Sequence, residues 1–87
     1  MFTGIVESAS ISAIDVQETG WKLDVTSTSV TPRVKLGDSV AIDGACLSVI
    51  AIHNDTMSFF VSTESISKTI IKYYIEGSKV NIELPLQ

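Results

Sequence analysis

Cysteine, histidine and proline are scarce in this sequence of 87 residues, which holds one, one and two of them. A lone cysteine, Cys46, cannot form an intrachain disulfide, so the domain must be held by packing alone, and a reducing cytoplasm is the expected compartment. One histidine, His53, and one thiol are too few soft ligands for a metal centre, and we expect no metal. Because His53 precedes the turn signal Asn54-Asp55, we interpret it as a solvent-exposed loop residue.

Positive charge is sparse as well. Six Lys and Arg residues stand against ten Asp and Glu residues, for a net charge of -4, and no basic cluster occurs. A phosphate backbone would be repelled on average, so no nucleic-acid partner is expected. The longest apolar stretch, around residues 46–52, is far shorter than a membrane span, so no membrane partner is expected. With 45% hydrophobic residues, the chain is predicted to form one compact domain over residues 1–87.

The sequence begins with the apolar stretch MFTGIVES, which is too short for the core of a secretory signal peptide and has no basic residue before it. Chain ends usually fray unless a sheet holds them. Because Phe2 directly follows Met1, we expect the amino end to be docked against the chain's own core, a ligand site or another subunit.

Apolar and polar residues alternate with a period of two along most of the chain, which predicts strands. We expect them at residues 8–13, 21–26, 39–42, 45–52, 57–62 and 79–84. Asp43-Gly44 and Asn54-Asp55 predict tight turns, and residues 26–38 predict a loop. Ser65 is expected to cap a short helix that ends at Gly77. The predicted fold is all-β, a six-stranded antiparallel Greek-key β-barrel with one short helix.

Two segments of the sequence resemble each other. LGDSVAI and EGSKVNI, at residues 36–42 and 76–82, both place a glycine before a polar residue and an alternating strand. We interpret this as repeated turn chemistry, because about seven residues are too few to indicate a repeated unit.

Two groups of polar residues are candidates for a site. Cys46 and Ser48 lie on the same face of a predicted strand. In one interpretation, Cys46 is a small buried hydrophobic residue and the Ser48 hydroxyl bonds a neighbouring backbone group. In the other, the two side chains form a polar site in the otherwise apolar wall of the barrel. The stretch STES at residues 62–65 is either a helix N-cap, with Glu64 at the positive end of the dipole, or a grip for a planar ligand. Composition and spacing leave these alternatives open.

Four segments resemble the lumazine-binding repeat of riboflavin synthase in order and spacing. They are MFTGIVE, GDSVAIDGACLSV, FFVSTESISKT and GSKVNIE, and the resemblance covers nearly all 87 residues. It implies a six-stranded Greek-key barrel, and an enzyme with two repeats per chain that assembles as a homotrimer. That family transfers a four-carbon unit between two molecules of 6,7-dimethyl-8-ribityllumazine, giving riboflavin and a pyrimidinedione without metal or organic cofactor.

The resemblance also implies a set of site residues. Each active site lies between an amino-terminal repeat and a carboxy-terminal repeat of a neighbouring subunit, so one repeat supplies half a site. The residues that it assigns to catalysis are Phe2, Ser39, Cys46 and Ser48. Those that it assigns to substrate binding are Ser39, Ala41, Cys46, Ser48, Ser62, Thr63, Glu64 and Ser65. The 7-methyl group of the lumazine is acidic, so the protein chiefly orients two rings and stabilises charge.

The sequence departs from this family at a few positions. Ser48 and Ser65 stand where Thr is usual, Asp43 stands where Asn is common, and Leu84 replaces an Arg. The serines keep the hydroxyl but lose the stiffness of a β-branched side chain, so contacts to a ligand would be looser. Only one repeat lies within these 87 residues.

The preferred hypothesis is the amino-terminal domain of a riboflavin synthase, which binds lumazine and riboflavin and forms a homodimer when isolated. The alternative is a non-catalytic lumazine or flavin carrier, or an optical protein, related to the enzyme. A barrel that binds nucleic acid or mediates contacts is disfavoured by the charge.

Overall fold

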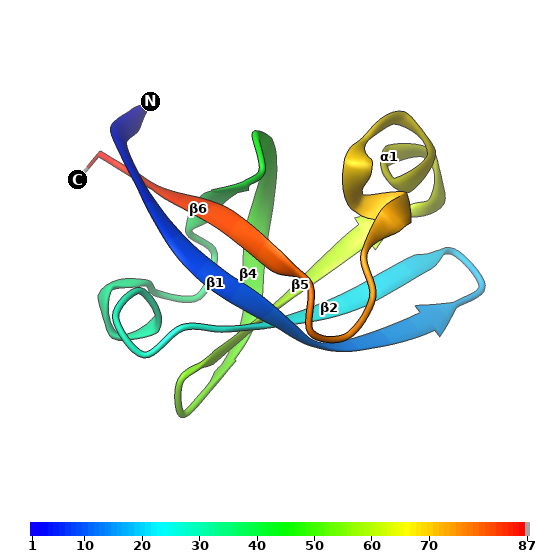
Figure 1. Ribbon diagram of the computed structural model, residues 1–87, viewed down its shortest axis with the longest axis horizontal. Helices are drawn as coiled ribbons and strands as arrows, with labels where there is room; N and C mark the ends of the chain where they lie inside the picture. The colour runs from blue at the N-terminus through cyan, green and yellow to red at the C-terminus, as the bar shows by residue number, and fades with distance from the viewer. Residues whose placement is uncertain (87) are drawn as a thin grey trace.

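The computed structural model describes residues 1–86, which form a closed barrel of six antiparallel strands in the order β1-β2-β5-β4-β3-β6 (Figure 1). The strands are β1 (Phe2–Gln17), β2 (Gly20–Thr26), β3 (Ser39–Ile42), β4 (Ala45–His53), β5 (Thr56–Ser62) and β6 (Lys79–Pro85). The helical segments are α1 (Thr63–Lys68) and two 3-10 turns, η1 (Thr31–Arg33) and η2 (Ile70–Tyr73). The predicted all-β barrel with one short α-helix is confirmed.

The core of the barrel is made by the inward half of each alternating strand. Its largest fully buried side chains include Phe59, Leu23, Met57 and Ile42. Because neighbouring residues of a strand face opposite sides, the polar residues between them lie on the outside of the barrel. Any ligand site of this chain is therefore expected on the outer surface or at the ends, since apolar side chains fill the interior.

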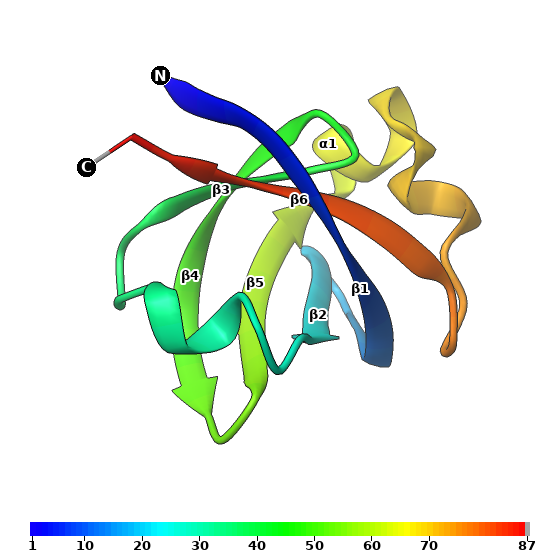
Figure 2. The same cartoon turned by 60° about the vertical axis from the view of Figure 1, so that its left-hand side comes forward.

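The amino end is held by backbone pairing with β6, but the side chains of Met1, Ile5 and Val6 are exposed and do not pack on the chain's own core. Their docking against a ligand site or another subunit stays a prediction. β1 extends 16 residues from Phe2, and Phe2 pairs with Pro85 of β6. The Leu86 backbone N–H donates to the carbonyl of Met1 at 2.9 Å. A register shift between Phe2 and Val6 separates this short pairing from the main β1–β6 ladder. The two chain ends thus form a paired extension beyond the barrel, which Figures 1 and 2 both show.

The predicted helix differs from the observed one at both ends. Ser62, not Ser65, is the N-cap: its backbone is extended, and its hydroxyl accepts from the Ser65 N–H at 3.2 Å. Ser62 fits this role because it is the last residue of β5, where the backbone is still extended. Thr69 then leaves the helical conformation at φ -131° and caps η2 through its own hydroxyl. The helix therefore ends well before Gly77.

The second half of the barrel repeats the first. β1 and β2 form a hairpin that leads through η1 into β3, and β4 and β5 form a hairpin that leads through α1 and η2 into β6. Gly37 and Gly77, which both precede the last strand of their half, have positive φ angles of 87° and 93°. The Gly37 N–H donates to the Val49 carbonyl, and the Gly77 N–H donates to the Ile11 carbonyl. The turns at residues 36–42 and 76–82 therefore occupy equivalent positions in two halves of the barrel that are related by a pseudo-twofold axis.

Asp43 connects the β3–β4 turn to two distant segments. Its Oδ1 accepts from the Asn81 N–H at 2.8 Å, and its Oδ2 accepts from the Tyr74 hydroxyl. Asp43 has a φ of 48°, a left-handed conformation that Asp tolerates better than most residues. Burial, followed by the hydrogen bond to Asp43, raises the pKa of Tyr74 well above its ordinary value of 10.0.

Tyr74 is therefore expected to make the domain sensitive to alkali. The pKa of Tyr74 is raised in the folded state, so its contribution is complete below about pH 10 and is lost as the pH rises further. Replacing Tyr74 by Phe should remove this alkaline loss and lower the free energy of unfolding at neutral pH by about 1 kcal/mol. Urea unfolding at several pH values measures both effects, with Tyr73→Phe as the control because Tyr73 is 73% exposed. An unchanged alkaline slope in Tyr74→Phe would contradict the assignment.

Candidate functional site

Four of the predicted site residues lie together on the outer face of β3 and β4. Ser39 pairs with Ser48, and Ala41 pairs with Cys46. Their strand neighbours Val40, Ile42, Leu47 and Val49 are buried in the core, so the four must point outward. Residues directly opposite on an antiparallel pair have Cβ atoms about 5 Å apart. The structure therefore places one thiol, two hydroxyls and a methyl group in a compact square.

Exposure distinguishes between the two interpretations that the sequence left open for Cys46. The side chain is exposed, and so is that of Ser48. Cys46 is therefore not a small hydrophobic residue of the core. Ala41 is 7% exposed and forms the floor between Cys46 on β4 and Glu83 on β6, with which it also pairs.

The ladder between β4 and β5 stops where this polar square begins. It extends from His53↔Thr56 to Val49↔Phe59 and includes a register shift between Val49 and Ala51. Continued in the same register, it would place Ser48 opposite Phe60 and Cys46 opposite Ser62. These pairs are not formed, so backbone groups that face this gap have no strand partner within residues 1–86. The gap is a place where a flat molecule with donors and acceptors on its edges can bond to the backbone.

The start of α1 forms the far side of this gap. Ser62, Thr63, Glu64 and Ser65 are all exposed. The hydroxyls of Ser62 and Ser65 lie 3.1 Å apart, and the Thr63 N–H donates to the Thr19 carbonyl at 3.1 Å. The Glu64 carboxylate pairs with Lys68 one turn later at 2.9 Å. The N-cap interpretation of this stretch is thus correct for Ser62, while its hydroxyls and Glu64 remain accessible.

A hollow of about 290 Å³ adjoins the same region. It lies between the β3–β4 turn, residues 43–45, and the junction of α1 with η2, residues 69–71. Figure 2 shows the tip of the β3–β4 hairpin beside α1. We call the polar square and the open edge of β4 the β4 face; the hollow lies next to it along the chain, at Ile42 and Ala45.

Phe2 is the predicted site residue that the structure does not bring to the β4 face. It pairs with Pro85 at the outer end of β6, and the amino end lies on the side away from α1 in both Figure 1 and Figure 2. The side chain is half-buried. The contact between Phe2 and a ligand that the resemblance implies therefore stays a prediction.

Two residues that the sequence did not point to, Glu83 and Phe60, border the β4 face. Glu83 lies across Ala41 from Cys46, and its Oε2 accepts from the Gly4 N–H at 2.6 Å. Phe60 lies next to the gap, 38% exposed, and a Cβ added at Gly20 would meet its ring at 2.7 Å. The glycine leaves room for this ring, which holds the end of β5 against β2. The adjacent phenylalanines of the FFVS segment were the available signal, because one of the two had to face outward.

The remaining candidate residue of the sequence analysis, His53, lies apart from the β4 face. His53 is exposed at the end of β4 away from the polar square. Within residues 1–86, no group of three or more His, Cys, Asp and Glu side chains is placed to hold a metal ion. In the same described range, no helix has the length and apolar character that crossing a membrane requires.

Comparison with known sequences connects the chain to one family. The family described as the lumazine binding domain matches residues 3–85. The riboflavin synthase of Bacillus amyloliquefaciens is 38% identical over 84 residues, which cover 95% of this chain and 39% of that protein. The riboflavin synthase of Photobacterium phosphoreum is 36% identical over 85 residues, again covering 95% and 39%. The chain thus spans 39% of the length of these relatives.

Comparison with solved structures agrees. The crystal structure of LumP complexed with 6,7-dimethyl-8-(1'-D-ribityl) lumazine matches the chain with a TM-score of 0.87 and 27% sequence identity. The match covers 97% of this chain and 48% of that one.

Proposed function

This chain belongs to the lumazine binding domain family, and on that premise we propose that it binds 6,7-dimethyl-8-ribityllumazine on the β4 face. The observation that carries the proposal is the fold match to a protein solved in complex with that compound. The polar square beside an unpaired strand edge supplies the chemistry that such a ligand needs.

The flat ring is proposed to lie in the gap between β4 and β5. The edge of a lumazine carries carbonyl oxygens and ring nitrogens, which suit the unpaired backbone groups of residues 46–48 and 60–62. The ribityl chain carries hydroxyls, which suit the side chains of Ser62 and Ser65 at the start of α1. A few placed polar groups on an apolar support are typical of small-molecule sites. Riboflavin, which shares the ribityl chain and the planar ring, is proposed to bind in the same way.

The proposed catalytic role is half of a dismutation site. The curated relatives are riboflavin synthases more than twice as long as this chain, so the activity of the whole protein is a proposal here. Two lumazines stacked between this β4 face and a second repeat would exchange a four-carbon unit, yielding riboflavin and a pyrimidinedione. Ser39, Cys46 and Ser48 would orient the ring and assist proton transfer, which needs no strong base. A homodimer of this domain would bring two such faces together.

A fluorescence titration with 6,7-dimethyl-8-ribityllumazine tests the binding proposal. We expect saturable binding at micromolar concentrations, and Ser48→Ala should weaken it about fivefold through the loss of about 1 kcal/mol of hydrogen bonding. Ser12→Ala is the matched control, because Ser12 is an exposed strand serine on β1. Absence of saturation in the unmodified protein would contradict the proposal.

The same samples separate the enzyme from a carrier. Formation of riboflavin from bound lumazine, followed by its absorbance and by size-exclusion chromatography, would support a catalytic dimer. Tight binding by a strict monomer that never forms riboflavin would favour the carrier that the sequence left as the alternative.

A further inference from the structure

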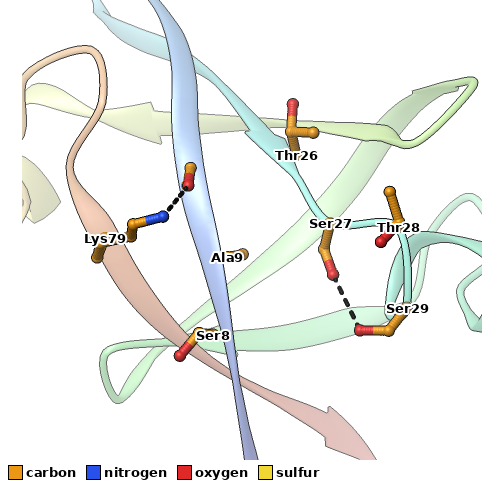
Figure 3. A pocket seen from close by; sticks show the side chains of 8 residues that line it. Ser8, Ala9, Thr26, Ser27, Thr28, Ser29 and Lys79 are labelled. Atoms are coloured by element: carbon orange, nitrogen blue, oxygen red, sulfur yellow. Dashed lines mark hydrogen bonds between the residues drawn. The ribbon is translucent and has the colours of Figure 1, made fainter.

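A second hollow, of about 280 Å³, lies on another part of the barrel. β1 contributes residues 8–10, the end of β2 and the following loop contribute residues 26–29, and β6 contributes Lys79. Figure 3 shows Ser8 and Ala9 on β1, between Lys79 on one side and Ser27 to Ser29 on the other. None of these residues belongs to the β4 face.

The pseudo-twofold relation between the halves of the barrel maps the β4 face onto this hollow. The pair Ser39↔Ser48 on β3 and β4 corresponds to Lys79↔Ser10 on β6 and β1. The next outward pair along those ladders, Ala41↔Cys46, corresponds to Asn81↔Ser8.

The strand that follows in each half is related in the same way. The β4–β5 ladder has its register shift just after Val49↔Phe59, and the β1–β2 ladder has one just after Ile11↔Val25. Beyond Ser10↔Thr26 the β1–β2 ladder stops, as the β4–β5 ladder stops beyond Val49↔Phe59. In each half, an unpaired strand edge therefore lies beside an outward-facing polar pair. In the first half, this pair is Lys79↔Ser10 and the unpaired edge lines the hollow of about 280 Å³.

The two openings differ in the side chains that they offer. The hollow is lined by six hydroxyl side chains, one methyl group and one ammonium group, with no aromatic ring: Ser8, Ala9, Ser10, Thr26, Ser27, Thr28, Ser29 and Lys79. A planar heterocycle has nothing to stack on here. Hydroxyls that both donate and accept suit a polyol, and an ammonium group suits an oxyanion.

Lys79 is available for such an anion. Its Nζ donates to the Ser10 hydroxyl at 3.3 Å. The two ion pairs within residues 1–86 are Arg33 with Glu7 and Lys68 with Glu64, so no carboxylate neutralises Lys79 there.

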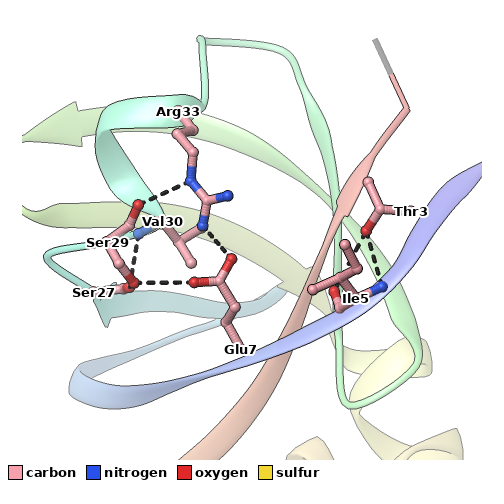
Figure 4. Close-up of polar contacts among 7 residues, drawn as sticks. All are labelled: Thr3, Ile5, Glu7, Ser27, Ser29, Val30 and Arg33. Atoms are coloured by element: carbon pink, nitrogen blue, oxygen red, sulfur yellow. Dashed lines mark hydrogen bonds and ion pairs between the residues drawn. The ribbon is translucent and has the colours of Figure 1, made fainter.

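The carboxylates at the rim are already engaged. Glu7 accepts hydrogen bonds from Arg33 and from Ser29 (Figure 4). The hydrogen bond from Arg33 lowers the pKa of Glu7, so this carboxylate stays ionised and paired. The Asp55 carboxylate accepts from the Thr56 hydroxyl, which lies 3.0 Å from that of Thr26, and the Asp55 backbone carbonyl accepts from the Ser27 N–H at 2.9 Å. The uncompensated positive charge is thus on the Lys79 side of the hollow.

We propose that this hollow is a second ligand site, which takes a small phosphorylated polyol. The phosphate binds the Lys79 ammonium and the Ser10 hydroxyl. The polyol hydroxyls bind the Ser8 hydroxyl and the hydroxyls of residues 26–29, on the side of the hollow opposite Lys79. The site is distinct from the β4 face, because the two share no lining residue.

Titration of the backbone amide NMR spectrum with glycerol 3-phosphate tests the site, with inorganic phosphate and glycerol as comparison probes. We expect saturable shifts at residues 8–10, 26–29 and 79, with a millimolar Kd, and at least about fivefold weaker binding of the other two probes. Lys79→Gln should raise the Kd at least about tenfold, whereas Lys35→Gln, an exposed lysine with the same change of charge, should leave it unchanged. Ser8→Val, which fills the hollow at an exposed strand position, should also weaken binding.

Three results would overturn the proposal: no saturable shift, an equal effect of Lys79→Gln and Lys35→Gln, or equal affinity for glycerol 3-phosphate and inorganic phosphate. A separate titration with ribityllumazine should shift residues 39–48 and 62–65 instead. Failure of one titration with success of the other therefore identifies which of the two sites is wrong.

Discussion

Replacing Cys46 by tryptophan is expected to weaken lumazine binding at least about 100-fold, or about 2.8 kcal/mol at 1.4 kcal/mol per tenfold. Cys46 is exposed, lies opposite Ala41 and flanks the gap between β4 and β5. An indole at this position occupies the space proposed for the ring. Because the side chain points away from the core, the free energy of unfolding should change by only about 0.5 kcal/mol. Fluorescence titration and urea unfolding of the same sample measure the two quantities.

His53→Trp provides the matched control. It places the same side chain on the same strand, at an exposed position at the other end of β4. Binding should equal that of the unmodified protein. If Cys46→Trp binds lumazine as tightly as His53→Trp and the unmodified protein, the ligand binds elsewhere. Cys46→Ser would then also leave the lumazine affinity unchanged.

Replacing Gly20 by alanine is expected to destabilise the fold by about 2–3 kcal/mol, a fall of about 10–20 °C in Tm for a domain of this size. A Cβ at this position would lie 2.1 Å from the Val61 carbonyl oxygen and 2.7 Å from the Phe60 ring. The ring can rotate, but the carbonyl belongs to the paired strand and can move only if β2 and β5 separate. Differential scanning calorimetry measures the change.

The strain should also reach the β4 face. Gly20 pairs with Ser62, which caps α1, so separating the strands displaces the residues proposed to hold the ribityl chain. We expect Gly20→Ala to bind lumazine more weakly even where it is fully folded. Thr19→Ala, a substitution at the neighbouring exposed turn position, should change neither stability nor binding by more than about 0.5 kcal/mol. A Gly20→Ala variant as stable as Thr19→Ala would contradict the close approach of the two strands.

The architecture was predictable because its signals are local. Alternation in Trp21 to Val25 and in the segments around Leu47 and Phe59 predicts which residues enter the core, and a small closed barrel is one arrangement that buries six such faces. The turns at Asp43-Gly44 and Asn54-Asp55 were predictable for the same reason, since Asp43 and Asn54 adopt the positive φ angles that such turns require.

The candidate site was only partly predictable. The pairing of Ser39 with Ser48 and of Ala41 with Cys46 follows from a short hairpin, so their grouping was within reach of the sequence. The position of Phe2 was not, because it depends on the pairing of the two chain ends, which are far apart in sequence. The sequence favours Ser65 over Ser62 as N-cap only because several hydroxyl residues in a row are locally equivalent. Ser62 is the N-cap because β5 ends there, where the backbone is still extended.

The amino-acid sequence by itself determined the strands, the tight turns, the family and the residue types available for a ligand, because each depends on neighbours in the chain. Only the tertiary structure decided that Cys46 faces outward, that β4 and β5 part beside it, and that Ser8 and Lys79 occupy the equivalent opening in the other half. These facts depend on where each ladder stops, and a ladder stops where strands distant in sequence can no longer keep their register around a closed barrel.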